Sequence, residues 1–266
     1  FLMRMLYVFM DIFGKRKEEV HNNSESKKNF NHKFMKNHFE NGIDKIYSIK
    51  HFKKYVIENN KNVDIFFHCW NIDKETQELL IKEYKPKRYI FENQDNSNYK
   101  FDYKNTINIP RFYSEEQSIN LLLDYEKENN IEYDLVLHTI FDQLFFTYID
   151  LSSLNPEFIY NSNYNEARPK IKKNNKRHFI TGGLYDQWYI SSPKNLKKIC
   201  NLKSFIKLYK KYPYKKHGGH MHRYELIKNK NLENKLKFIL YVGIDHIKCN
   251  QILCPWYKHC TKFLLN

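Results

Sequence analysis

Residues 63–92, VDIFFHCWNIDKETQELLIKEYKPKRYIFE, contain a complete strand–helix–strand pattern. The apolar run at 63–67 is typical of a buried strand, and 88–91 form a second run of this kind. Between them, 74–84 have a helical pattern, which Pro86 ends because proline disfavours helical geometry in the residue before it. Two strands joined by such a helix predict a right-handed crossover between parallel strands.

Further patterns of this type lie on both sides of this unit. Apolar runs at 5–10 and 135–137 predict two more strands, and helical spacing predicts two helices within 29–59. Ser114 followed by Gln117 is a capping-box pattern, which predicts a helix from there to about residue 129. We therefore expect an α/β fold with a mostly parallel sheet flanked by helices.

The second half of the chain is less regular. Residues 161–177 and 214–223 are polar and basic, which is typical of surface loops. Strand patterns lie at 178–181, 187–191 and 238–242. Ser192 followed by Pro193 predicts the start of a helix that runs to about residue 212, and a further helical stretch reaches about residue 235. We expect one continuous domain, with an α/β half at 1–150 and a less regular half at 151–266.

The composition is basic, with a net charge of +15 among 266 residues. Such a charge suggests an anionic partner, but lysine far exceeds arginine, and arginine is the better bidentate reader of phosphates and bases. No run of 18 apolar residues exists, and the apolar start of the chain is interrupted by Arg4 and Asp11, so we interpret it as a strand rather than a signal peptide. The odd number of cysteines, five, favours a reducing compartment, and we expect a cytoplasmic protein.

Several enzyme classes lack their local motifs. The sequence contains no G-x-x-x-x-G-K-[ST] phosphate loop, no G-x-G-x-x-G fingerprint, no H-E-x-x-H and no G-x-S-x-G elbow. P-loop, kinase, zincin and α/β-hydrolase activities therefore have no support from motifs.

Polar residues instead gather at the predicted strands, where open parallel sheets bind ligands at the carboxyl ends. We expect this group to line one edge of the sheet and to bind a ligand: Asp64, His68, Trp70, Asn71, Glu92 and Asp142. The alternative for each residue is a helix cap or a hydrogen bond to a turn amide.

Four stretches of the chain carry a resemblance to a known family: NVDIFFHCWN, ELLIKEYKPKRYIFE, YSEEQS and LLDYEKENNIEYDLVLHTIFDQLFF. Together they resemble GT-A-type sugar-nucleotide glycosyltransferases similar to those of surface-polysaccharide loci and large DNA viruses. The similarity covers roughly residues 60–150, and TGGLYDQWYISSP at 181–193 to a lesser extent. It implies a GT-A-like, Rossmann-related fold in which 1–150 bind the nucleotide sugar and 151–266 serve the acceptor and catalysis.

The resemblance also implies roles for individual residues. Gly14 and Arg16, after the first strand, match a loop that contacts the donor, and Asp142 occupies the place of an acidic motif that touches a divalent metal or the donor sugar. The family usually has an arginine and another charged residue just before this position, where the chain has residues 138–140, HTI. A second ligand for Mg²⁺ or Mn²⁺ would then come from elsewhere, and His220 or His222 could serve.

Glycosyl transfer needs a base for the acceptor hydroxyl and a group that stabilises the nucleoside diphosphate leaving group. Asp186, between the 182–183 glycine turn and Trp188, suits the base, because burial beside aromatic surface raises a carboxyl pKa. A helix or turn cap is the alternative for Asp186. Glu225 matches a glutamate that the family commonly has near this point, and a solvated loop is the alternative for the surrounding histidines.

Two other functions compete with a transferase acting on a nucleotide-sugar donor and a glycan or glycoconjugate acceptor. The basic segments IKKNNKR and KLYKKYPYKKH, with their tyrosines, could bind single-stranded nucleic acid. The chain could also be a catalytically inactive homologue, because the arginine expected before Asp142 is missing.

Overall fold

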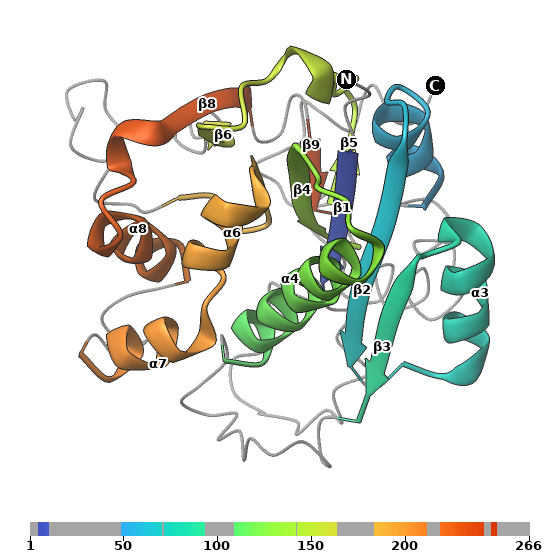
Figure 1. Ribbon diagram of the computed structural model, residues 1–266, viewed down its shortest axis with the longest axis horizontal. Coiled ribbons are helices and arrows are strands. Elements are labelled where there is room, and N and C mark those ends of the chain that lie inside the picture. The colour runs from blue at the N-terminus through green and yellow to red at the C-terminus, as the bar shows by residue number, and fades with distance from the viewer. Residues whose placement is uncertain are drawn as a thin grey trace, which may run out of the picture.

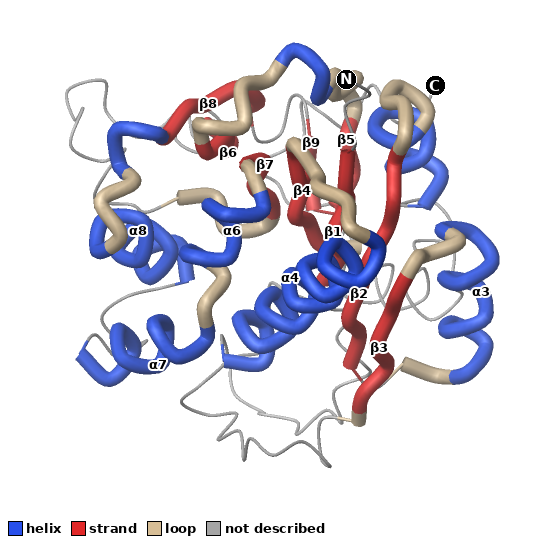
Figure 2. Tube along the Cα trace, in the orientation of Figure 1, coloured by secondary structure: helices blue, strands red, loops and turns tan. Residues whose placement is uncertain are grey.

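The computed structural model describes residues 5–10, 49–70, 72–93, 109–141, 143–163, 184–211, 219–241 and 246–248. Helices lie on both faces of one large sheet, and Figure 2 distinguishes the two kinds of element. The strands of this sheet are β1 (Met5–Met10), β2 (Val63–Trp70), β3 (Arg88–Glu92), β4 (Leu135–Ile140), β6 (Ile159–Asn163), β7 (Trp188–Ser191) and β8 (Leu236–Tyr241). A separate pair comprises β5 (Gln143–Phe145) and β9 (His246–Lys248).

The helices connect and cover these strands (Figure 1). They are α3 (Lys74–Tyr84), α4 (Ile109–Asn129), α6 (Pro193–Ile199), α7 (Leu202–Lys211) and α8 (Gly219–Asn229). Short helical segments are the π-helix η1 (Lys53–Ile57) and the 3-10 helices η3 (Leu151–Ser153) and η4 (Glu233–Lys235).

The strand order in the large sheet is β3-β2-β1-β4-β7-β6-β8. The first four strands in this order are parallel, as the crossover pattern predicts, whereas β7 pairs antiparallel with β4. The chain fills the sheet in one direction from β1 to β3 and then crosses by way of α4 to β4, on the other side of β1. The strand order therefore reverses at β1, which defines the place where open α/β sheets bind ligands.

Two hydrophobic cores lie on opposite faces of the sheet, because successive strand residues point to opposite sides. On one face, Phe67 and Leu137 pack with Phe52 and with Leu80 of α3. On the other face, Phe66 and Val136 belong to the core that includes buried side chains of α4, α6 and α8. The fold is thus a single α/β domain of helices, sheet and helices, and strands from both halves of the chain build its sheet.

The strand–helix–strand unit at 63–92 has the predicted structure. Helix α3 spans Lys74–Tyr84, and Asp73 caps its start by accepting a hydrogen bond from the Thr76 amide at 2.8 Å. Lys85, before Pro86, adopts the left-handed conformation, with φ of 46°. The proline restricts this residue and the helix ends there.

Three predicted helix boundaries are wrong. Helix α4 begins at Ile109 rather than near Ser114, because Pro110 is tolerated in a first turn and the Ser114 hydroxyl bonds to His68 instead of capping the helix. The helix predicted to run to about residue 212 is two helices, and only Cys200 and Asn201 separate them. Helix α8 includes 219–223, which the sequence analysis assigns to a basic loop. The predicted strand at 178–181 lies outside the described residues.

Candidate active site

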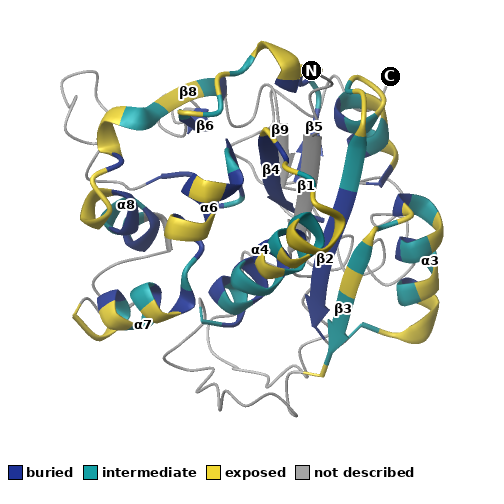
Figure 3. Ribbon diagram, in the orientation of Figure 1, coloured by how far each residue is buried: buried dark blue, intermediate teal, exposed yellow. Residues whose placement is uncertain are grey.

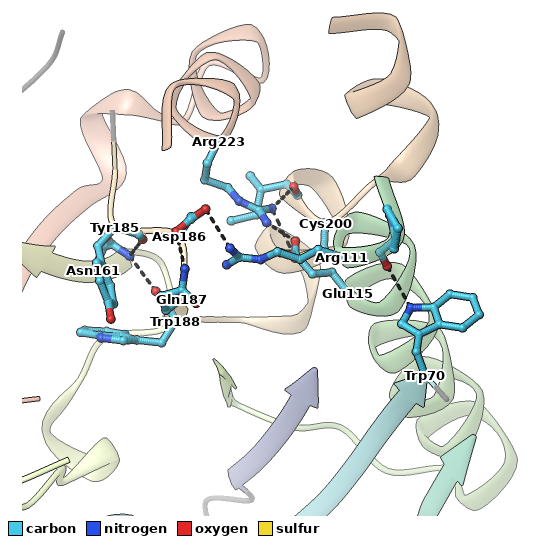
Figure 4. Close-up of polar contacts among 12 residues, drawn as sticks. Trp70, Arg111, Glu115, Asn161, Tyr185, Asp186, Gln187, Trp188, Cys200 and Arg223 are labelled. Carbon is cyan, nitrogen blue, oxygen red and sulfur yellow. Dashed lines mark hydrogen bonds and ion pairs between the residues drawn. The ribbon is translucent and has the colours of Figure 1, made fainter. Parts of the chain in front are cut away.

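The first turns of α4 lie against the carboxyl ends of β2 and β3. The Trp70 indole donates a hydrogen bond to the Pro110 carbonyl at 3.2 Å (Figure 4). Further along α4, the hydroxyl oxygen of Ser114 lies 2.9 Å from the His68 ring nitrogen Nδ1. The helix therefore holds two of the predicted site residues, His68 and Trp70, in fixed positions at the ligand-binding edge.

His68 joins this helix contact to Glu92, the last residue of β3. Its Nε2 lies 3.1 Å from a Glu92 carboxylate oxygen, and the Tyr113 hydroxyl donates to the other oxygen at 3.3 Å. Burial lowers the pKa of His68, and the hydrogen bond and charge of Glu92 oppose that shift. A neutral ring donates from Nε2 to the carboxylate and accepts the Ser114 proton at Nδ1. Glu92 is one-third exposed and is thus a fixed, accessible carboxylate.

Asp186 lies just before β7 and pairs with Arg111 of α4. The guanidinium donates from Nη1 to one carboxylate oxygen at 2.8 Å, and the side-chain amide of Gln187 donates to the other at 2.7 Å (Figure 4). The sequence predicts that the Asp186 carboxylate is desolvated beside aromatic surface. In the structure Asp186 is buried, and its carboxylate pairs with a cation, the Arg111 guanidinium.

Arg111 continues into a chain of buried charges. Its Nε lies 3.4 Å from Glu115, whose other oxygen pairs with Arg223 of α8. Arg223 also donates to the Ile199 carbonyl at 2.6 Å, and its guanidinium lies over the rings of Phe112 and Tyr189. Two cations and two carboxylates thus connect α4, α8 and the segment before β7 in a neutral network (Figure 4).

His138 of β4 and Tyr189 of β7 face each other in register beside this network. Burial, followed by the charges of Arg223 and Arg111, lowers the pKa of His138 well below its ordinary value of 6.5. Burial also raises the pKa of the Tyr189 hydroxyl. Neither side chain has a hydrogen-bond partner for its ring nitrogens or hydroxyl within the described structure, so both are neutral polar groups of the interior.

Asp64 does not join the predicted edge. It lies near the amino end of β2, where it accepts a hydrogen bond from the Tyr133 hydroxyl at 2.7 Å and lies 3.5 Å from Lys87. Strand residues rise by about 3.3 Å each, which places it about 20 Å from Trp70 along the strand. The expectation that Asp64 lines the carboxyl edge is therefore wrong.

Two of the residues expected to hold a metal, His220 and His222, lie on one helix. His222 lies in helix α8 rather than a loop and is buried against the rings of Phe205 and Tyr209, at 5.4 and 5.7 Å between centroids. His220 and Glu225 lie on the same helix. Within the part of the chain that the structure describes, no three His, Cys, Asp or Glu residues form a group that could hold a metal ion.

Four predicted site residues lie outside the described ranges: Gly14, Arg16, Asn71 and Asp142. Their proposed roles stay predictions. The strands that precede them do have defined places, because Met10 of β1 is in register with Ile140 of β4 and with His68 of β2. In the sequence, Gly14 thus follows β1 and Asp142 follows β4, the two neighbouring strands at which the strand order reverses.

No local sequence pattern predicts the buried network of Arg111, Glu115 and Arg223. One signal could have revealed it, because the chain has only seven arginines among its 45 basic residues. In a chain whose composition favours lysine, an arginine indicates a position that requires the planar guanidinium group and its several hydrogen-bond donors. Nothing in the local pattern indicates which acids these arginines would meet.

No family model matches the chain, and no curated protein resembles it in sequence. Its fold resembles several solved structures of glycosyltransferases. GlyE from Streptococcus pneumoniae TIGR4 matches with a TM-score of 0.41 and 10% identity over 89% of this chain and 45% of that chain. This chain therefore spans less than half the length of GlyE.

Two further structures match over nearly the whole chain. A glycosyltransferase involved in glycosylation of the major capsid of PBCV-1 has a TM-score of 0.40 and 10% identity, and covers 97% of this chain and 98% of that chain. Mouse xyloside xylosyltransferase 1 has a TM-score of 0.45 and 10% identity, with 97% and 89% covered. At these identities the likeness does not assign an activity.

Proposed function

We propose that this protein is a glycosyltransferase that moves a sugar from a nucleotide-sugar donor to a glycan or glycoconjugate acceptor. The observation that supports it most is the reversal of strand order at β1, with His68, Trp70 and Glu92 fixed at the carboxyl edge by α4. Nucleotides bind α/β sheets in the crevice beside such a reversal. The resemblance of residues 60–150 to sugar-nucleotide glycosyltransferases supports glycosyl transfer as the reaction class.

The donor roles follow from the places of the preceding strands. Gly14 and Arg16 follow β1 and would contact the diphosphate, where a fixed cation stabilises the leaving group. Asp142 follows β4, the neighbour of β1 in the sheet, and would hold the donor sugar or a divalent cation. Among the described residues, no three His, Cys, Asp or Glu side chains form a group that could hold Mg²⁺ or Mn²⁺.

Asp186 keeps two candidate roles that an experiment can separate. As a general base it would accept the proton of the acceptor hydroxyl, and its loss would cost about a hundredfold or more in turnover. As the partner of Arg111 it would position the start of α4 against the sheet edge. The positioning role is favoured, because both carboxylate oxygens of Asp186 already accept hydrogen bonds from neighbouring side chains.

A donor screen tests the activity. The chain is incubated with a panel of nucleotide sugars, with and without Mg²⁺ or Mn²⁺, and released nucleoside diphosphate is measured. We expect release with one donor class and a thermal shift with the matching nucleoside diphosphate. No release and no shift with any nucleotide, together with a salt-dependent shift from single-stranded oligonucleotides, would overturn the proposal in favour of nucleic-acid binding.

Four variants locate the site once a donor is found. Asp142→Ala should abolish release, whereas Asp64→Asn, an acid at the opposite edge, should leave it unchanged and serves as the matched control. Asp186→Asn with full donor affinity, unchanged thermal stability and a hundredfold loss of turnover would identify the base. A loss of thermal stability that Arg111→Met reproduces would identify the positioning role. Donor binding without turnover in the unaltered chain would indicate an inactive homologue.

A further inference from the structure

The exposed residues of helices α6 and α7 are all lysines. The two helices contain 17 residues, and the exposed ones are Lys194, Lys197, Lys198, Lys203, Lys207, Lys210 and Lys211. We call this set the lysine face. Figure 3 shows exposed segments on both helices, which only Cys200 and Asn201 separate in the chain.

The lysine bias of the chain does not explain this face. In α3 the exposed residues are two lysines and two glutamates, and the exposed residues of α4 include Asp124 and Glu128 beside Lys127. The exposed surfaces of these two helices carry charges of both signs, as solvated helices commonly do. Neither α6 nor α7 contains an acidic residue.

The fold holds the lysines of α7 on one side. The buried side chains Leu202, Phe205 and Leu208 pack on the core between α4 and α8. At 100° per residue, the lysines at 203, 207, 210 and 211 fall within about a third of the helix circumference, opposite that buried side. Their attachment points span about 12 Å along the helix at a rise of 1.5 Å per residue.

Nearby carboxylates are already engaged. The hydrogen bond from Lys235 at 2.7 Å and its charge lower the pKa of Glu157, and the charges of Lys194 and Lys198 add to this shift. Glu116 accepts the Leu202 amide at the start of α7, together with the side chain of Asn201. Apart from Lys211, the lysines of this face form no ion pair within the described structure, so the face keeps most of its positive charge.

The composition of the face selects among anionic partners. Single-stranded nucleic acid needs aromatic side chains on which bases stack, and the large hydrophobic residues exposed in the described structure, Tyr89, Tyr148 and Phe238, lie on other elements. Arginine, the residue that binds phosphates in a bidentate manner, is absent from both helices. Lysines on flexible stems suit a diffuse layer of anionic head groups, to which each contributes without fixed geometry.

We propose that the lysine face docks this protein on an anionic lipid surface. The attraction would be peripheral and electrostatic. No helix in the described part of the chain is long and apolar enough to cross a membrane. Each lysine near an anionic bilayer strengthens binding by about fivefold, and the attraction falls with ionic strength. This inference does not depend on the proposed transferase activity.

Vesicle sedimentation of the full chain tests the proposal. We expect binding to phosphatidylcholine vesicles that contain phosphatidylserine, little binding to phosphatidylcholine alone, and release by salt. The triple variant K203Q/K207Q/K210Q should bind about a hundredfold more weakly. The matched control K61Q/K82Q/K127Q removes the same charge from exposed positions elsewhere and should retain most of the binding.

Circular dichroism and thermal melting of both triple variants check that they fold, which we expect because all six lysines are exposed. Absence of binding to phosphatidylserine vesicles at low salt would overturn the proposal. So would equal losses in the two triple variants, which would show that net charge alone acts. Binding to a DNA duplex or a sulfated polysaccharide, but not to vesicles, would assign the face to that polyanion instead.

Discussion

At the residue scale, the buried ion pair between Glu115 and Arg223 decides how α8 meets α4. Both side chains are fully buried, so each charge depends on the other for its compensation. Taking charges out of water costs free energy that the attraction and further hydrogen bonds must offset. The pair is therefore better evidence for a specified arrangement of helices than for high stability.

We predict that Glu115→Gln lowers the free energy of unfolding by about 3–5 kcal/mol, because it leaves the Arg223 guanidinium buried without a carboxylate. Urea denaturation measures the change. The double variant E115M/R223M should recover much of the loss, since it removes both charges. Equal stability of E115Q and the original chain would contradict the burial of this pair.

Histidine burial predicts a loss of stability in acid. Burial holds the pKa of His138 and of His68 below 6.5 in the folded state, so the unfolded chain binds more protons as pH falls. The stability contributed by the neutral rings is present above pH 6.5 and is lost as pH falls from there toward the folded pKa values. The slope should be about 1.4 kcal/mol per pH unit for each group.

Unfolding in urea between pH 7 and pH 5 checks this expectation. His138→Leu should flatten the dependence on pH, because it removes one of the groups that takes up a proton on unfolding. The exposed Lys61→Gln serves as a control that should leave the slope unchanged. An identical slope in H138L and the original chain would exclude His138 as a source.

At the scale of elements, local chemistry makes α3 predictable and leaves α4 less so. Asp73, the apolar spacing and Pro86 all agree on the bounds of α3, and the structure matches them. The start of α4 depends on tertiary contacts, because Ser114 bonds to His68, which is 46 residues earlier in the chain. A capping pattern in the sequence cannot reveal that the hydroxyl is occupied elsewhere.

The candidate site likewise combines features that local sequence predicts with features that depend on tertiary contacts. Strand ends follow from apolar runs, so His68, Trp70 and Glu92 could be placed at the carboxyl edge from sequence. Asp64 does not lie at that edge, because it is the second residue of the run 63–67 and therefore lies at the other end of its strand. The Arg111–Asp186 pair joins residues 75 positions apart, and no periodicity carries that information.

We predict that Asp73→Ala destabilises the protein by about 1 kcal/mol, because the Thr76 amide loses its cap. Thermal or urea unfolding measures this loss. Asp73→Ser keeps an acceptor at the N-cap and should retain most of the stability, which distinguishes capping from a general effect of charge. A larger loss in D73S than in D73A would contradict the capping role.

At the scale of the whole molecule, the halves 1–150 and 151–266 share their structure. The sheet places β7, β6 and β8 beyond β4, and one core combines Phe66 and Val136 with Tyr189 and Ile199. Each half alone would expose the apolar surface that the other covers. The candidate site is shared as well, because Arg111 from the first half pairs with Asp186 from the second.

We predict that the chain unfolds in one cooperative transition and that residues 1–150 expressed alone do not. Helix α4 would lose its contacts with α6 and α7, and β4 would become an exposed edge without β7. Circular dichroism and tryptophan fluorescence should therefore report coincident transitions in the full chain, with none of comparable sharpness in the fragment. Two separated transitions, or a cooperatively unfolding fragment, would show that the first half is an independent domain. In that case the Arg111–Asp186 pair would join two domains, and weakening it by Asp186→Asn should change the separation of the transitions.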